Sequence, residues 1–396
     1  MRAIHLPVWL GSVKRPRAKT FAALFALSIV SRALLITVIP LNANAILGSA
    51  QRVSLLYFGV SIVALLGSLS IPWLVHKIRR RRVFTLGCLA TVAAMPLLAS
   101  DTLTVFVLGM VFLVFAISCL EITFNLYLMD HIPREELGRF EPLRVFFAAG
   151  SWTLGPWLGV YLQKNVADWA PFACAAIGAV VLCATFWILR LKENPAVAPA
   201  KGPPPRPTKY LHRFFGQPRL RLAWFLAMGR SAWWSMFFVF APIYAVDSGL
   251  SAETGGAIVS LGAAAVFGAP AWGWVGRRFG FRRLLIGGYG LSALATYAIA
   301  VFAGVPDAGA IALVAAAVVT GIIDGAGNLP FLRAVHPWER PEMTTVFSTY
   351  RDMALLVPPG IFAVLLKVFA LPAVFVASAS FMVVLAAFSR YLPRRF

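Results

Sequence analysis

Apolar segments of about 20 residues recur along almost the whole chain, and this repetition is the feature that most constrains its fold. An α-helix of about 20 residues spans the hydrocarbon core of a bilayer. Of the 396 residues, 60% are hydrophobic and 13% are charged, which would leave soluble domains of this size with an apolar surface. The sequence therefore excludes a string of soluble domains and predicts an all-α integral membrane protein.

We expect twelve transmembrane helices in two sets of six. The first set is expected at about 20–40, 52–75, 83–100, 103–129, 140–162 and 170–191. The second set is expected at about 219–245, 253–275, 282–303, 309–332, 344–367 and 371–391. A basic segment with six prolines from Pro195 to Pro207 lies between them and favours an extended linker. The expected domains are a six-helix bundle at 1–191, a cytoplasmic central loop at 192–218 and a second bundle at 219–396.

The positions of the basic residues predict the orientation in the membrane. The formal net charge is +21, and nearly all Lys and Arg residues lie on alternate loops, whereas the opposite loops hold only Arg52, Lys164 and Lys367. Such a bias is the positive-inside rule, which places both termini in the cytoplasm. We expect a multi-pass protein of the cell inner membrane, surrounded by lipid and without a nucleic-acid partner.

The two halves resemble each other in sequence. Late in the fourth and in the tenth expected helix, an acid is followed four residues later by Asn-Leu. A His, a Pro and a Glu come after this motif in both halves. An Arg then opens the next expected helix in both halves. Matches in the same register indicate an internal duplication. The corresponding residues are Glu121 and Asp324, Asn125 and Asn328, and Arg144 and Arg351.

The 6+6 layout with a basic central loop and cytoplasmic ends resembles the major facilitator superfamily over essentially the whole chain. The resemblance implies two pseudo-symmetric six-helix bundles around a central cavity, and secondary transport by alternating access. That family's signature after helices 2 and 8 is roughly Gly-x-Leu-Ala-Asp-Arg-x-Gly-Arg-Arg. Here the acidic position holds His76 in one copy and Arg277 in the other, while Arg80, Arg81 and Gly280 fit the pattern.

Two further features bear on this resemblance. Asp130, at the end of the fourth helix, is available to pair with Arg80 or Arg81, as a similar acid does in the family. The fifth helix carries Gly155-Pro156-Trp157-Leu158-Gly159, which resembles part of a motif of family antiporters. The Arg motif that those antiporters carry in helix 4 is missing, so close helix packing at the two glycines with a bend at the proline also explains the segment.

Two arginines lie near the middle of expected spans. A charge in the hydrocarbon region is costly unless it is paired or faces water, so Arg32 and Arg230 are candidates for function. Aligning the halves on Pro40 and Pro242 places the two arginines about one turn apart on the same face. We expect no acid at matching depth, so both guanidiniums should be available to bind a carboxylate or phosphate. The arrangement resembles the family's organophosphate:phosphate antiporters. The alternative is a structural or gating pair with an acid.

The duplicated charges form the second set of candidates. Glu121 with Arg144, and Asp324 with Arg351, are expected in the cytoplasmic third of helices 4, 5, 10 and 11. They would form either an inner gate whose salt bridges open and close or permanent clasps within each half, and the sequence leaves both readings open. Asn125 and Asn328, about one turn further on, are expected to hydrogen-bond carbonyls at the helix ends.

The sequence does not favour an enzyme. The five histidines fall at cytoplasmic ends or tails, the four cysteines fall inside apolar runs, and no Gly-Lys pair exists for a phosphate-binding loop. We expect no cofactor and no metal. The predicted function is that of a monomeric secondary transporter for a small organic anion, driven by proton coupling or exchange. The alternative is an exporter of hydrophobic compounds, indicated by Trp233, Trp234, Phe237 and Phe238 in the seventh helix.

Overall fold

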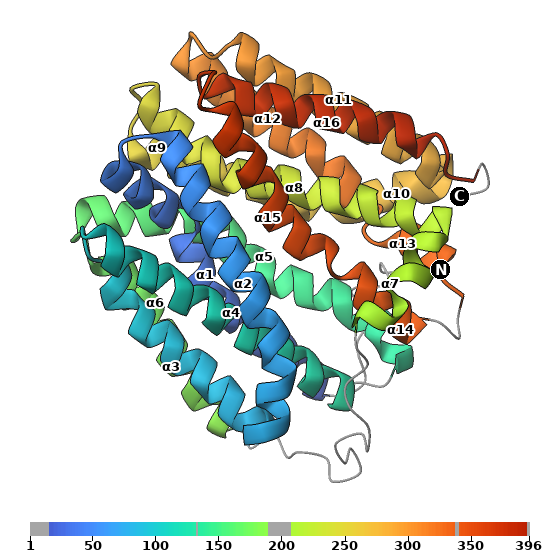
Figure 1. Ribbon diagram of the computed structural model, residues 1–396, viewed down its shortest axis with the longest axis horizontal. Coiled ribbons are helices and arrows are strands. Elements are labelled where there is room, and N and C mark those ends of the chain that lie inside the picture. Colours follow the sequence, from blue (N-terminus) through green and yellow to red (C-terminus); the bar gives the residue numbers. More distant parts are fainter. Residues whose placement is uncertain (1–15, 132–133, 189–206, 337–339, 394–396) are drawn as a thin grey trace, which may run out of the picture. The chain divides into compact units, whose positions relative to one another are not determined.

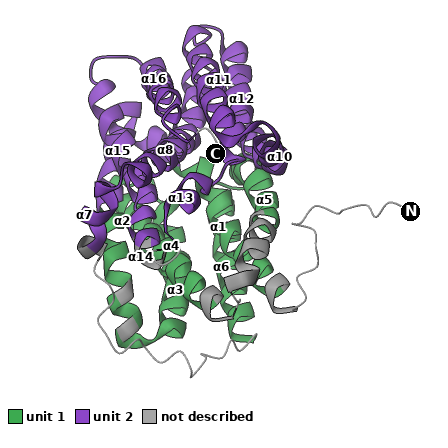
Figure 2. Cartoon of the chain, turned by 90° about the vertical axis from the view of Figure 1, so that its right-hand side faces the viewer, with its two compact units in different colours: residues 1–39, 63–202 green, residues 40–62, 203–396 purple. Residues whose placement is uncertain are grey.

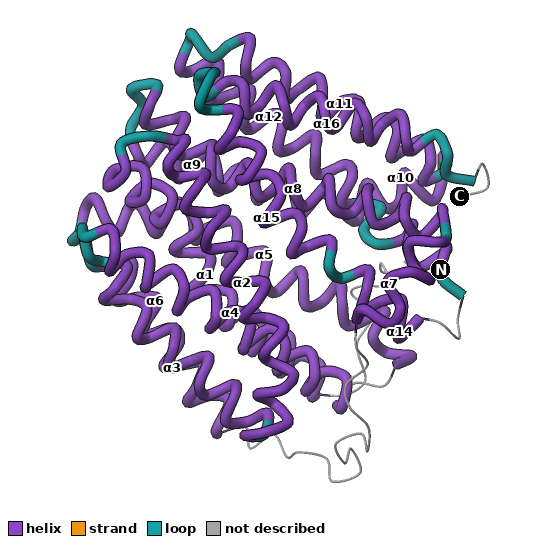
Figure 3. Tube along the Cα trace, viewed as in Figure 1, coloured by secondary structure: helices purple, strands orange, loops and turns teal. Residues whose placement is uncertain are grey.

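The computed structural model describes residues 16–131, 134–188, 207–336 and 340–393, and the regular elements in these ranges are all helices (Figure 1, Figure 3). The first half holds α1 (Pro16–Leu47), α2 (Ala50–Ile78), α3 (Arg80–Leu98), α4 (Leu103–His131), α5 (Arg134–Asn165) and α6 (Ala170–Ile188). Each corresponds to one expected span. Within the described ranges, nine helical segments are long and apolar enough to cross a membrane, which agrees with the predicted all-α membrane fold.

The second half is more interrupted than the sequence predicts. Its elements are α7 (Pro207–Gly216), α8 (Pro218–Asp247), α9 (Ala252–Ala263), η1 (Ala264–Gly268), α10 (Ala269–Phe279), α11 (Phe281–Val301), α12 (Pro306–Asp324), α13 (Leu329–Ala334), α14 (Arg340–Phe347), α15 (Tyr350–Leu365) and α16 (Pro372–Ser389). The expected eighth helix is α9 with α10, joined by a 3-10 turn. The expected tenth and eleventh helices are each divided in two, as α12 with α13 and α14 with α15.

A short amphipathic helix occupies the end of the expected central loop. α7 places Phe214, which is fully buried, in one cluster with Leu220 and Trp224 of α8, while His212 and Arg213 are exposed. Apolar residues at helical spacing therefore form one face of α7, and burying this face stabilises the helix against the second half. This helix was not predicted, because the prolines that precede it favour an extended linker.

The chain divides into two compact units (Figure 2). Unit 1 comprises residues 1–39 and 63–202, and unit 2 comprises residues 40–62 and 203–396. Residues 40–62 belong to the first half of the sequence but pack with the second. Their contacts include a hydrogen bond of 3.0 Å from Asn44 Nδ2 to Asp247 Oδ1 and one of 3.0 Å from Ser61 Oγ to the carbonyl of Leu355.

Glycines on α5 allow it to lie directly against α1 in unit 1. A Cβ added at Gly155 would come within 2.7 Å of the Ala33 backbone, and one added at Gly159 would overlap the Leu34 carbonyl oxygen. Small residues four apart permit such backbone contact between membrane helices. This geometry supports the packing explanation of the Gly155 to Gly159 segment.

The turns from α2 to α3 and from α10 to α11 correspond in the two halves. Each pivots on one residue with positive φ, Arg79 at 71° and Gly280 at 94°. Glycine adopts this conformation without a steric penalty, whereas a side chain at positive φ and extended ψ is strained by about 1–3 kcal/mol. Arg79, with ψ at 150°, therefore carries strain that Gly280 avoids.

Arg79→Gly should stabilise the protein by about 1 kcal/mol, since it relieves the strain at the turn. Thermal unfolding of the purified protein in detergent, followed by tryptophan fluorescence, measures the effect. Arg82→Gly is the matched control, because it removes the same charge but puts glycine inside α3. Equal melting temperatures for the two variants would show that the turn is unstrained.

Candidate functional site

In unit 1, Arg32 of α1 forms an ion pair with Glu121 of α4. Arg32 Nη1 donates to Glu121 Oε1 at 2.6 Å, and the two side chains are 32% and 45% exposed. The guanidinium carbon also lies 5.7 Å from the ring centroid of Trp152 on α5, within the range of a cation–π contact. The pair borders a cavity that Phe25 and Phe124 also line.

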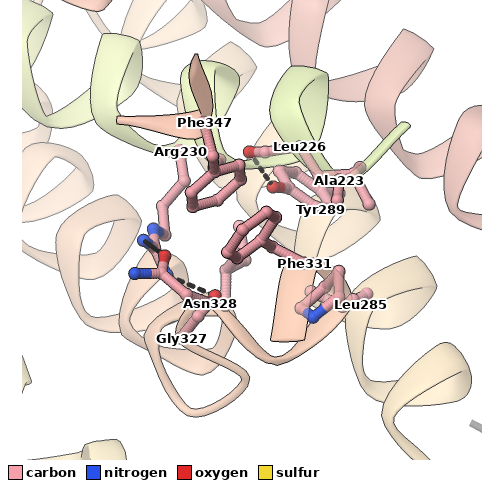
Figure 4. A pocket seen from close by; sticks show the side chains of 12 residues that line it. Ala223, Leu226, Arg230, Leu285, Tyr289, Gly327, Asn328, Phe331 and Phe347 are labelled. Carbon is pink, nitrogen blue, oxygen red and sulfur yellow. Dashed lines mark hydrogen bonds between the residues drawn. The ribbon is translucent and has the colours of Figure 1, made fainter. Parts of the chain in front are cut away.

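In unit 2, Arg230 of α8 forms the corresponding pair with Asp324, the last residue of α12. Arg230 Nε lies 3.6 Å from Asp324 Oδ1, and the side chains are 12% and 20% exposed. The other two guanidinium nitrogens donate to the Gly327 carbonyl at 2.9 Å and to Asn328 Oδ1 at 3.2 Å (Figure 4). Asp324 Oδ2 in turn accepts from Trp234 Nε1 at 3.1 Å. This second pair is therefore more enclosed and has more partners.

The helix break between α12 and α13 creates the site in unit 2. Gly325 packs so closely on Trp272 that a Cβ would clash, and Gly327 has a φ of 52°. Backbone that leaves the helix within a membrane span must be hydrogen-bonded by the protein or line a cavity. Arg230 satisfies one carbonyl at the break, and the cavity beside it is lined by Tyr289 and Phe331, among others (Figure 4).

The two pairs correct one expectation from the sequence. We expected no acid at matching depth, yet Glu121 and Asp324 are within reach of Arg32 and Arg230. Helical side chains lean toward the N-terminus of their own helix. Because the first and fourth spans of each half run in opposite directions, a long arginine and an acid at different depths lean toward each other. The depths of the Cα atoms alone therefore do not predict which charged groups meet.

The proposed gate residues are placed differently from the expected pairs. Glu121 and Asp324 contact Arg32 and Arg230, and the side chain of Arg144 lies outside the described residues. Arg351 Nε donates to the hydroxyl of Tyr350 at 3.2 Å. Arg351 therefore has a partner, Tyr350, that no sequence pattern indicated.

Of the remaining sequence candidates, Asn328 joins the second pair. Asn125 is exposed on α4, whereas Asn328 accepts from Arg230 instead of capping a helix end. Arg80 and Arg81 begin α3, Arg277 is exposed in the last turn of α10, and Gly280 forms the turn to α11. The side chains of His76 and Asp130 lie outside the described residues.

Sequence reasoning missed Trp152 and Gly327 as residues of the two sites, and it named Trp234 only as an indication of hydrophobe export. Gly325 and Gly327 within an apolar run were a readable signal of a helix break. Trp152 and Trp234 had no such signal, because an aromatic residue in a membrane helix equally suits packing or lipid contact.

Comparisons with known proteins agree with this architecture. The sequence profile described as Major Facilitator Superfamily matches residues 21–270. The nucleoside transporter NupG is similar in structure with a TM-score of 0.72 at 15% identity, over 97% of this chain and 98% of that one. A POT family transporter in complex with 5-aminolevulinic acid has a TM-score of 0.71 at 13% identity, over 94% of both chains. The peptide transporter POT in complex with sulfate has a TM-score of 0.71 at 12% identity, over 94% of this chain and 93% of that one. The comparison with curated protein sequences found no match.

Neutralising the acid of the pair in unit 2 should lower the stability of the protein more than neutralising the acid of the pair in unit 1. Asp324→Asn leaves the enclosed Arg230 without its counter-ion, whereas the more exposed Arg32 left by Glu121→Gln can be solvated. Thermal unfolding of the singles and of the doubles Arg32→Gln/Glu121→Gln and Arg230→Gln/Asp324→Asn gives each coupling energy. We expect about 0.5–3 kcal/mol, with the larger value in unit 2. Additive doubles would show that the ion pairs contribute nothing.

Proposed function

The chain belongs to the major facilitator superfamily, and from that premise we propose a secondary active transporter whose Arg32 binds the carboxylate or phosphate of a small organic anion. The observation that carries this proposal is the ion pair of Arg32 with Glu121 beside a cavity inside unit 1. A guanidinium offers five N–H donors, and Glu121 takes a hydrogen bond from one nitrogen. A substrate anion can therefore join or replace Glu121 on the same cation.

The two arginines differ in how readily they could accept a substrate. Arg32 is 32% exposed, whereas Arg230 is 12% exposed and its three nitrogens contact Asp324, Gly327 and Asn328. An anion at Arg230 would have to displace several partners at the helix break. We therefore assign first contact with substrate to Arg32, and to Arg230 a change of partners during the transport cycle.

Glu121 provides a route to proton coupling. When an anion binds Arg32, the carboxylate of Glu121 is left beside a second negative charge, and taking up a proton removes the repulsion. Substrate and proton then favour each other's binding, so affinity should increase as the pH falls until the substrate itself is protonated. Movement of both in the same direction would use a proton gradient. Exchange of two anions on Arg32 would use the same residues without the proton.

The structure gives less support to the rival, an exporter of hydrophobic compounds. Trp233 and Phe237 are 2% and 0% exposed, and their rings stack at 5.3 Å inside unit 2. Trp233 Nε1 also donates to Thr296 Oγ1 at 2.9 Å. Trp234 Nε1 donates a hydrogen bond to Asp324 Oδ2. Three of the four aromatic residues that indicated this function therefore hold the helices together.

Residues 40–62 supply a candidate gate for alternating access. We propose that the six-helix halves, 1–191 and 219–396, move against each other in the inner membrane, with both termini in the cytoplasm. Asn44, Phe58 and Ser61 come from the first half but contact Asp247, Gly360 and Leu355 of the second. Rocking of the halves would have to break these contacts in each cycle.

A ligand screen with purified protein tests the substrate class. Succinate and glycerol 3-phosphate are the anionic probes and tetraphenylphosphonium is the lipophilic cation, with thermal stabilisation as the readout. An anion should stabilise the protein. Arg32→Lys should weaken its binding about tenfold, because the bidentate fork is lost, and Arg32→Gln should weaken it more. Arg52→Gln removes an exposed charge and should have no effect. Undiminished anion binding by Arg32→Gln, or stabilisation by the cation alone, would contradict the proposal.

A cross-link tests the gate. A Cβ at Gly360 would lie 3.0 Å from the Phe58 ring, so cysteines at both positions should form a disulfide in a background without the native cysteines. Oxidation should then stop transport of the stabilising anion, and reduction should restore it. The single variants Phe58→Cys and Gly360→Cys control for the substitutions. Full transport by the cross-linked protein would show that these contacts stay closed throughout the cycle.

A further inference from the structure

Trp274 and Arg278 form an exposed pair at the end of α10. The Arg278 guanidinium carbon lies 5.3 Å from the ring centroid of Trp274 and 5.7 Å from that of Phe279. Trp274 is 51% exposed and Phe279 is 56% exposed. Two large aromatic rings beside a cation, at the end of a membrane helix, are typical of the headgroup level of a bilayer.

The first half repeats this arrangement. Trp73 of α2 is 60% exposed, and Lys77 Nζ, one turn later, lies 4.9 Å from its ring centroid. The positive-φ residues Arg79 and Gly280 follow the two pairs at the same spacing in the sequence. The aromatic ring and its cation therefore occur at corresponding positions in both units. A chance surface contact does not explain a recurrence in register with the duplication.

The sequence segments that carry both pairs are basic. The segments 72–83 and 269–283 contain no acidic residue. Arg277 and Arg283 are exposed beside Arg278, and the Arg333 guanidinium lies 5.9 Å from the ring of Phe281. Near the first pair, Arg79 and Arg82 are exposed. Each ring thus lies at the edge of a patch of positive charge.

A phospholipid headgroup matches both parts of this surface. Its phosphodiester accepts the forked donors of an arginine, while the tryptophan ring packs on the glycerol and upper acyl region. A free phosphate would use the cations but would leave the rings in contact with water. We propose that the Trp73–Lys77 and Trp274–Arg278 pairs are two equivalent binding sites for anionic phospholipid, such as phosphatidylglycerol.

Native mass spectrometry of the full-length protein in detergent tests the two sites, with phosphatidylglycerol and phosphatidylcholine as lipid probes. At low lipid concentration, we expect up to two retained phosphatidylglycerol molecules and weaker retention of phosphatidylcholine. Arg278→Gln should weaken retention at one site about fivefold, as expected for about 1 kcal/mol per basic residue. Combining Trp274→Ala with Arg278→Gln should remove one bound lipid. Adding Trp73→Ala and Lys77→Gln should remove the second.

Three controls separate this proposal from its alternatives. Arg219→Gln removes an exposed charge from the start of α8 and should leave retention unchanged, and Arg278→Lys should keep part of it. Circular dichroism checks that the variants keep their helix content. The proposal is overturned if Arg219→Gln lowers retention as much as Arg278→Gln, if the four-residue variant retains both lipids, or if inorganic phosphate displaces them at equal concentration. None of these outcomes bears on transport of an anion by Arg32.

Discussion

The requirement that a charge inside a membrane span must have a partner or reach water organises both halves of this structure. Arg32 and Arg230 each sit on the first helix of a half, and each meets an acid on the fourth. A buried guanidinium without such a partner would oppose insertion of its helix. The acids therefore satisfy the charge that the first span of each half carries. Both proposed roles of these residues, in substrate binding and in conformational change, depend on pairs that the fold already requires.

The two pairs differ because only the second one meets a broken helix. α4 continues past Glu121, whereas α12 ends at Asp324 and the chain turns through Gly325 and Gly327 before α13 begins. The break presents a carbonyl and an amide oxygen to Arg230 and so encloses it. The arginine of unit 1 is therefore accessible, whereas that of unit 2 is held by several partners. An asymmetry of this kind suits a transporter that binds substrate on one side and changes contacts on the other.

Hydropathy was sufficient to predict the membrane fold, since each span is a local property of the sequence. The equivalence of Glu121 with Asp324 was also readable, because duplicated positions keep their register. The contacts of these acids could not be predicted from the sequence. Long helical side chains point toward the N-terminus of their own helix, so their charged groups lie at a different membrane depth from their Cα atoms. α7 and the division of the tenth helix were missed for a different reason. Local signals were present in both segments, namely apolar residues at helical spacing in α7 and the glycines Gly325 and Gly327 in the tenth helix, but the prolines before α7 and the apolar run of the tenth helix were given more weight.

Calorimetry tests most directly whether Glu121 couples a proton to substrate binding, as proposed. Titrating the stabilising anion into the purified protein in buffers of different ionisation enthalpy counts the protons taken up on binding. If Glu121 is displaced from Arg32 and protonated, binding should be accompanied by proton uptake, and the uptake should disappear in Glu121→Gln while the anion still binds. Binding without proton uptake by the unmodified protein, or unchanged uptake by Glu121→Gln, would show that this acid is not the coupling residue.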